Sequence, residues 1–170
     1  RRQRQMCIRD RGVTDQVVEV AANGFERAGY AFVGWNTAAD GSGQAYAAGA
    51  GYALTAGDDA LFAQWTANDG TAYTVNHYKV NAAHTAATLD NAENLNATTD
   101  AVVEATAQTI PGYTYQPLFD ENGMKTVASG TVAGDGSLVL NLYYTPDADA
   151  LAYHANGGQG TMAATEGVTD

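Results

Sequence analysis

The side chains of this chain that could bind a metal include three histidines. His77 lies in an alternating apolar segment, on the same face as Tyr73 and Val75. We therefore predict that it is a packed or hydrogen-bonded core residue rather than a ligand. His84 lies in a polar stretch and is predicted to be solvated, and His154 is predicted to lie on a strand near the end of the chain. No two of these histidines have the spacing of a metal site.

Three aspartates offer a second kind of metal chemistry, because calcium prefers several oxygen ligands. Asp40 opens an Asp-Gly-Ser-Gly sequence at 40–43, and Asp58 with Asp59 follows eighteen residues later. These residues are the candidate calcium ligands. The alternative is a tight turn with solvated acids, since the glycines can adopt positive φ. The segment lacks the dense carboxylate spacing of an EF-hand, which favours the turn.

Sequence motifs of catalysis and phosphate binding are missing. The chain has no Gly-x-Ser-x-Gly elbow and no His-Glu-x-x-His pair. Gly41-Ser42-Gly43 is followed by neither a helical pattern nor a nearby lysine, so it does not indicate a phosphate-binding loop. The sequence therefore predicts a protein that is not an enzyme and holds no cofactor.

β-Strands are the elements predicted to position these side chains. Alternating segments rich in aromatic and β-branched residues are typical of strands with one buried face. They occupy residues 16–20, 29–35, 61–65, 72–78, 111–115 (a turn into a strand) and 138–144. Residues 81–99 are a polar stretch. Residues 99–108 are compatible with a short helix, capped by Thr99 or Asp100, or with an irregular strand.

The charge is strongly asymmetric. Residues 1–11 hold five of the eight basic residues and the only cysteine, and the rest carries three basic and eighteen acidic groups, a net charge of −15. Residues 6–10 resemble translated sequencing-adapter DNA, so the leader 1–11 is predicted to be non-native; the alternatives are a disordered basic arm and a nucleic-acid or nuclear-targeting arm. So acidic a surface excludes nucleic acid and anionic membranes as partners. No apolar run approaches the length of a membrane span.

A tetrapeptide that occurs twice indicates how the chain is organised. Gly-Val-Thr-Asp stands at 12–15 and returns at 167–170. Residues 151–170 are therefore predicted to be the opening of a unit whose remainder resembles residues 12–67, as in a tandem repeat cut out of phase. Residues 71–145 form a second module, and 146–150 have the composition of a linker. Both modules contain a Gly-Tyr-x-aromatic strand.

The first module resembles the internalin-type B-repeat, also called the Listeria–Bacteroides repeat. The matching motifs are Gly29-Tyr30-x-Phe32-x-Gly34-Trp35-Asn36-Thr37, Asp40-Gly41-Ser42-Gly43 and Leu61-Phe62-Ala63-Gln64-Trp65, with Phe25. The family's opening strand and its Asn-Gly-Gly turn are missing from this module but occur within 151–162. The second module is similar to the mucin-binding-protein-like repeats of Gram-positive surface proteins, through Tyr73-Thr74-Val75-x-His77-Tyr78, Ile110-Pro111-Gly112-Tyr113 and residues 129–144.

This resemblance implies a mainly β, or α+β, chain of two small β-grasp-like modules in tandem, followed by a stub strand of a third. In that fold the first and last strands run parallel, side by side. The chain then enters a module at one pole and leaves it at the other, and linked modules form a rod.

The resemblance also implies a possible crosslink. Surface modules of related design join a lysine to an asparagine through an isopeptide bond, with a buried acid as catalyst. The corresponding residues here are Lys79, Asn141 and Glu104. The alternative is that Asn141 lies on the face away from the core with Val139 and Tyr143, which would disfavour the bond.

The predicted function is that of a non-catalytic stalk repeat of a bacterial cell-surface adhesin, extracellular and anchored to the cell wall through segments outside this chain. The expected partners are adjacent repeats. The alternative is a module that binds host glycan or mucin through aromatic residues, although aromatic side chains at strand spacing are more often core. The residues in question are Tyr30, Phe32, Trp35, Trp65, Tyr113, Tyr143 and Tyr144.

One further expectation concerns association. If the first module lacks its opening strand, it exposes unpaired backbone groups. The strand carried by 151–170 of another molecule would then complete it in trans, giving concentration-dependent oligomers.

Overall fold

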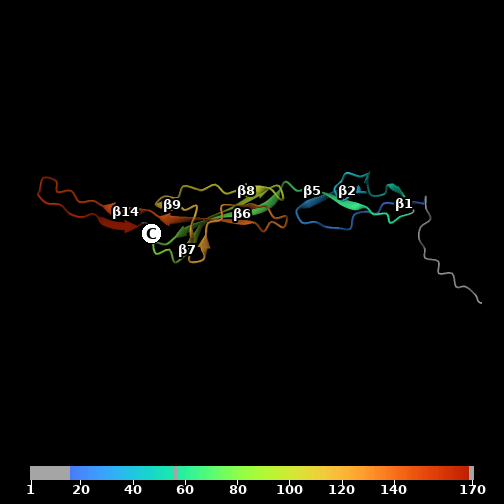
Figure 1. The fold of residues 1–170 in the computed structure, drawn as a ribbon. Helices are drawn as coiled ribbons and strands as arrows, with labels where there is room; N and C mark the ends of the chain where they lie inside the picture. The colour runs from blue at the N-terminus through green and yellow to red at the C-terminus, as the bar shows by residue number, and fades with distance from the viewer. Residues whose placement is uncertain (1–15, 56, 169–170) are drawn as a thin grey trace, which may run out of the picture. The chain divides into compact units, whose positions relative to one another are not determined.

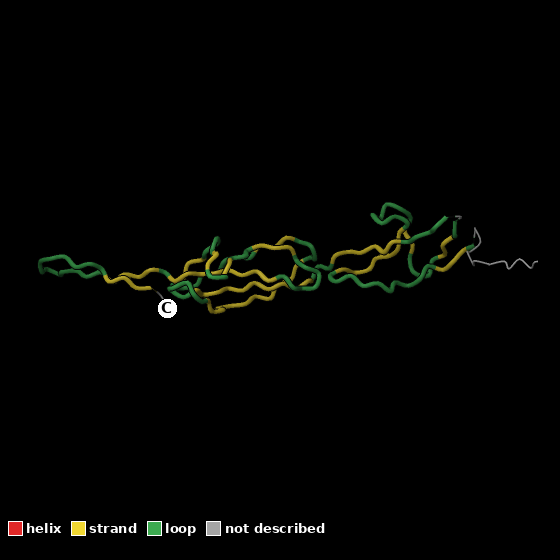
Figure 2. Tube along the Cα trace, turned by 60° about the horizontal axis from the view of Figure 1, so that its bottom comes forward, coloured by secondary structure: helices red, strands yellow, loops and turns green. Residues whose placement is uncertain are grey.

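The structure, a computed structural model, describes residues 16–55 and 57–168. These residues contain strands, turns and loops and no helix (Figure 2). The chain divides into two compact units, with the boundary between Thr66 and Ala67. The expected β-rich fold class is therefore confirmed at the level of an all-β chain of small sheets. The predicted leader 1–11 lies outside the described residues.

The first unit is built from two small sheets. One contains three strands in the order β3-β2-β5, and the other is the antiparallel pair of β1 and β4 (Figure 1). The bounds are β1 Val17–Glu19, β2 Tyr30–Asn36, β3 Ala45–Tyr46, β4 Gly51–Ala53 and β5 Phe62–Ala67. Among the described residues of this unit, Val20 is the one apolar side chain that is buried. The aromatic rings instead form a partly exposed edge-to-face chain.

The second unit contains a four-stranded mixed sheet in the order β7-β6-β13-β9. Its strands are β6 Thr71–Val80, β7 Ala87–Ala97, β9 Tyr113–Tyr115 and β13 Val139–Pro146. The first strand, β6, pairs in parallel with the last, β13, from Thr74 opposite Val139 to Lys79 opposite Tyr144. The expected parallel pairing of first and last strands is thus found in this unit. β7 and β9 pair antiparallel on the outer sides.

One face of this sheet carries the core. Alternation along β6 and β13 turns Val75, His77, Leu140, Leu142 and Tyr144 to that face, where each is at most 1% exposed. The face is covered by connecting segments that include the pair of β8 (Val102–Glu104) and β12 (Ser129–Thr131). Packing against this face supplies most of the unit's apolar burial.

The opposite face is covered by the short hairpin of β10 (Asp120–Glu121) and β11 (Met124–Lys125) and the residues beside it. Phe119, which is 7% exposed, stacks on Tyr143 with 5.6 Å between ring centroids. Tyr143 stacks on Tyr78 at 5.1 Å. An isolated bridge between Val127 and Asn141 fixes the segment to β13.

The two units share one local structure, the turn that precedes β2 and β9. Gly29 and Gly112 both have φ of 76°. In each case the next residue, Tyr30 or Tyr113, donates its backbone N–H to the carbonyl three residues earlier, at 3.0 Å. A positive φ at the third position is what a type II turn requires, and glycine adopts it without strain. The repeated Gly-Tyr motif therefore encodes the same turn into a strand twice.

The chain ends in a two-stranded hairpin. β14 (Ala148–Leu151) pairs antiparallel with β15 (Thr165–Val168). Asn156 and Gly157 form its turn with φ of 42° and 96°, and Gly158 donates its N–H to the Ala155 carbonyl at 2.8 Å. The opening strand was predicted within 151–162, and of these residues Leu151 alone belongs to a strand, β14, so the repeat boundary stays a prediction.

Two local predictions differ from the structure, and a third, which left two alternatives open, is decided by it. The polar stretch 81–99 contains the eleven-residue strand β7. Residues 99–108 contain the three-residue strand β8, which supports the irregular strand over the helix. Residues 146–150, predicted to be a linker, belong to β13 and β14 except for Asp147, which donates its N–H to the Gly112 carbonyl. Although residues 146–150 have the composition of a turn, they form strands because their backbone groups pair with β9 and β15.

Candidate functional site

The Asp-Gly-Ser-Gly segment of the first unit forms a turn whose oxygens are already used. The carboxylate of Asp40 accepts hydrogen bonds from the hydroxyl and the backbone N–H of Ser42, at 2.6 and 3.0 Å. The buried amide of Asn36 donates to the carbonyls of Gly41 and Gly43 and accepts from the N–H of Ala38. These contacts explain the motif as a structural one, because the carbonyls and carboxylate that would hold a cation instead hold the turn.

The other two candidate ligands lie on a separate loop. Asp59 accepts hydrogen bonds from the N–H and hydroxyl of Thr55 and from the hydroxyl of Tyr52, at 2.8 to 3.0 Å. Asp58 is exposed. Across residues 16–55 and 57–168, no group of three or more His, Cys, Asp or Glu side chains could hold a metal ion. Calcium binding by Asp40, Asp58 and Asp59 stays a prediction without a preformed cluster.

Acid should weaken the first unit through these carboxylates. Hydrogen bonds from Thr55 hold the pKa of Asp59 below its usual 3.8, and hydrogen bonds from Ser42 do the same for the pKa of Asp40. A lowered folded pKa contributes stability that is present above the unfolded pKa and is lost as the pH falls through the folded value. We expect the first unit to lose stability below pH 3.8. The Asp59→Asn variant should lose less stability over the same pH range than the wild type. Tryptophan fluorescence, reporting on Trp35 and Trp65, measures this; equal acid sensitivity in both proteins would contradict it.

The three residues of the predicted crosslink have other partners. Lys79 Nζ lies 2.6 Å from Asp90 Oδ1 and 5.2 Å from the ring centroid of Tyr113. Asn141 accepts a hydrogen bond from the amide of Asn76, which is its register partner. Lys79 follows Asn76 by three positions on β6, which corresponds to about 10 Å along a strand. Glu104 lies at the end of β8, outside the four-stranded sheet.

The intact mass of the chain should therefore equal the mass calculated from the sequence. An isopeptide bond between Lys79 and Asn141 would release one molecule of ammonia. Mass spectrometry of the denatured protein measures the difference directly. A mass reduced by one ammonia, and restored in Lys79→Arg, would show that the residues do react.

The most buried polar cluster surrounds His77, whose side chain is fully buried. Its Nδ1 lies 2.8 Å from the Tyr144 hydroxyl, and that hydroxyl also accepts the N–H of Gln108 at 2.9 Å. In the contact between the two side chains either the hydroxyl or Nδ1 is the donor, according to the imidazole tautomer. Nε2 makes no hydrogen bond, although Glu93 Oε1 lies 3.3 Å away. Glu93 is in turn hydrogen-bonded by the side chain of Gln108.

This cluster has the order carboxylate, imidazole, hydroxyl, but it is closed to substrate. Tyr144 is 0% exposed, and burial raises the pKa of its hydroxyl. A hydroxyl that is shielded from solvent and already hydrogen-bonded twice does not offer a nucleophile. The prediction that His77 is a hydrogen-bonded core residue is confirmed.

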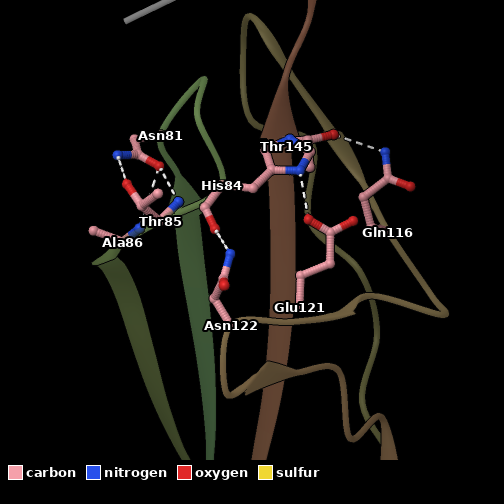
Figure 3. Close-up of polar contacts among 8 residues, drawn as sticks. All are labelled: Asn81, His84, Thr85, Ala86, Gln116, Glu121, Asn122 and Thr145. Atoms are coloured by element: carbon pink, nitrogen blue, oxygen red, sulfur yellow. Dashed lines mark hydrogen bonds and ion pairs between the residues drawn. The ribbon is translucent and has the colours of Figure 1, made fainter.

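His84 is not the solvated residue that the sequence indicated. It is half-buried, and its Nδ1 lies 2.9 Å from Glu121 Oε2 (Figure 3). Its ring packs edge-on against Phe119. Asn122 donates its side-chain N–H to the His84 carbonyl at 2.7 Å. Asn81 caps the same turn through the backbone N–H groups of Thr85 and Ala86. These contacts fasten the hairpin of β10 and β11 to the turn between β6 and β7.

His154 is exposed on the C-terminal hairpin.

Most of the aromatic residues that could stack on a sugar pack against other aromatic rings. Tyr144 is buried, and the six others of the predicted set are partly buried. Among the described residues, the exposed aromatic side chains are Phe25 at 64%, Phe62 at 42% and Tyr153 at 44%. The expected core position is therefore found for Tyr144, and glycan binding by this set stays a prediction.

Comparison with known proteins gives one distant similarity. A protein of Evansella cellulosilytica, named "Putative membrane protein", is 29% identical over 126 residues, which cover 65% of this chain. The match covers 19% of the length of that relative. No family model matches the chain, and no solved structure matches it. No helix long and apolar enough to cross a membrane is found in residues 16–55 and 57–168.

Proposed function

We propose that this chain is a non-catalytic structural segment of a bacterial cell-surface stalk, which holds a distal region away from the cell wall. The observation that carries the proposal is the parallel pairing of β6 with β13. Because the first and last strands of the sheet run in the same direction, the chain enters the second unit at one pole and leaves it at the other. A unit of this kind lengthens a polypeptide and transmits tension along it.

The local sequence supports a repeat architecture. The sheet order β7-β6-β13-β9 is the order expected of a β-grasp-like module, and we assign the second unit to that class. The Gly-Tyr turn recurs in the first unit, with the B-repeat-like motifs around it. Adjacent units of the same protein are then the partners. The acidic surface, with a net charge of −11 for the chain, suits a solvated extracellular stalk.

Force spectroscopy on the second unit tests the proposal. Pulling from Asn68 and Ala148 loads the bonds between β6 and β13 in shear, so that they must break together. Pulling from Asn68 and Ser137 opens the same strands from one end, bond by bond. We expect a clearly higher unfolding force in the first geometry. Both proteins carry Cys7→Ser, so that the native cysteine is not an attachment point. Equal unfolding forces in the two geometries would contradict the proposal that the β6–β13 pairing resists tension.

Recognition of glycan or mucin is the alternative function, and a second experiment separates it. Both tryptophans lie in the first unit, and Trp35 packs edge-on against the exposed ring of Phe25. Titration with mucin oligosaccharides should leave tryptophan fluorescence unchanged if the segment is a spacer. Saturable binding that is lost in Phe25→Ala would favour the glycan-binding module.

A further inference from the structure

The last strand of the first unit lacks a neighbour that its counterpart in the second unit has. β2 and β9 follow the same glycine turn, and each lies next to the last strand of its sheet, β5 or β13. β13 has β9 on one side and β6 on the other. β5 has β2 on one side, and in the part of the chain that is described no strand pairs with its outer edge. An open strand edge is a template for pairing with another strand.

Apolar side chains are also exposed among the described residues of the first unit. Phe25, Val33 and Phe62 are 64%, 66% and 42% exposed. Phe25 and Phe32 both pack on Trp35, and Phe32 also packs on Trp65 of β5. This aromatic cluster lies beside the open edge, because Trp65 belongs to β5. Phe25 is the exposed member of this cluster, and an exposed apolar patch is typical of an interaction site.

The C-terminal hairpin consists of two paired strands whose side chains pack on no other part of the described chain. Every side chain from Ala148 to Gly167 is exposed, including Leu151 at 60%, Tyr153 at 44% and Met162 at 70%. A two-stranded hairpin alone is at best marginally stable in water. In the second unit the equivalent antiparallel pair, β6 and β7, is held by β13.

We propose that the hairpin of residues 148–168 from one copy adds to the β5 edge in the first unit of a second copy, and covers its aromatic cluster. The hairpin would then pair with β5 in the way that the β6–β7 pair lies against β13 in the second unit. The sequence supports the match, because Gly-Val-Thr-Asp at 167–170 begins in the last two residues of the hairpin, and the same tetrapeptide precedes β1 at 12–15. This contact is independent of whether the chain extends a stalk.

A second copy is the chosen partner because of where the hairpin starts. β6 begins next to the link from the first unit and runs for ten residues, and β13 runs parallel to it. The end of β13, where the hairpin begins after Asp147, is therefore roughly 30 Å from that link. Return of the hairpin to its own chain's first unit would require it to run back along the whole sheet.

The electrostatics of the contact predict its salt dependence. Both copies carry a net charge of −11, and the hairpin itself carries Asp149 and Glu166. Like charges oppose association, so backbone pairing and apolar burial must drive it. Salt screens the repulsion, and association should strengthen as ionic strength rises. Association through complementary charges would weaken instead.

The full chain gives a direct test, because both tryptophans report on the first unit alone. Sedimentation and tryptophan emission are measured together over a wide range of concentration. We expect the mass to rise and the emission to shift to shorter wavelength in parallel. Leu151→Asp with Tyr153→Asp should stay monomeric with unshifted emission. Leu118→Asp, which changes an equally apolar side chain that is 94% exposed in the second unit, should associate like the wild type.

A synthetic peptide of residues 148–170 provides the second measurement. Added to the double variant, it should restore the shift in emission, and its Leu151→Asp form should not. A wild-type chain that stays monomeric at every concentration overturns the proposal. A monomer with emission shifted relative to the double variant also overturns it, since the hairpin would then fold onto its own chain. Loss of association in Leu118→Asp would place the contact elsewhere and overturn it as well.

Discussion

Leu142→Ala should unfold the second unit under conditions in which the first unit stays folded. Leu142 is 0% exposed and lies opposite His77 in the parallel pair, at the centre of the core cluster. Truncation of a fully buried leucine costs about 2–5 kcal/mol, because the lost transfer free energy adds to that of the cavity. Small domains are stable by about 5–15 kcal/mol, so the loss is a large share of the total.

Urea denaturation followed by two signals measures this effect. Far-UV circular dichroism reports on both units, whereas tryptophan fluorescence reports on the first. The variant should lower the midpoint of the transition seen by circular dichroism and leave the fluorescence midpoint in place. Val139→Ala, at a position 45% exposed on the same strand, should change stability by no more than about 0.5 kcal/mol. A fluorescence midpoint that moves by the same amount would show that the two units unfold together.

The strands that the sequence identified are those with unequal faces. Along β6 and β13, buried and partly exposed residues alternate, as the aromatic and β-branched pattern indicated. Alternation of this kind arises because one face of the sheet packs on a core and the other does not. The parallel pairing of these strands followed from the resemblance rather than from the pattern, because periodicity gives the faces of a strand but not its neighbour.

β7 was missed because it has almost no buried face. Its eleven residues are exposed or partly exposed, and its larger apolar side chains, Leu89 and Leu95, are 49% and 37% exposed. An edge strand is held mainly by backbone hydrogen bonds to one neighbour, which any side chain permits. The polar sequence therefore carries no alternation. Its partner, β6, was the one signal that a neighbouring strand was needed.

Two residues of the candidate sites could not be assigned from sequence. Asn36 was part of a motif, but its role as the buried amide that holds the 37–44 turn depends on carbonyls five and seven residues away. His84 was assigned to solvent because its own segment is polar. Its contact with Glu121 joins residues 37 positions apart, and a local pattern does not contain such a pairing.

Tyr144→Phe should destabilise the second unit although the aromatic ring is kept. The hydroxyl is the partner of two buried groups, His77 Nδ1 at 2.8 Å and the Gln108 N–H at 2.9 Å. Its removal leaves both without that hydrogen bond, and each orphaned group costs about 1–3 kcal/mol. The ring contacts with His77 and Tyr115 remain, so the loss reports on the hydroxyl. Tyr143→Phe is the matched control, since among the described residues its hydroxyl has no hydrogen-bond partner and its ring also has two aromatic neighbours, on the opposite face.

A double-mutant cycle with His77→Leu separates the pair from general damage to the core. Leucine has no nitrogen to leave unpaired, so the loss of the hydroxyl then orphans one group, the Gln108 N–H, instead of two. The double variant should be less destabilised than the sum of the single variants, by a coupling of about 0.5–3 kcal/mol. Urea midpoints of the four proteins give this coupling. If the two effects simply add, the contact between His77 and Tyr144 contributes nothing of its own, and the cluster is held by packing alone.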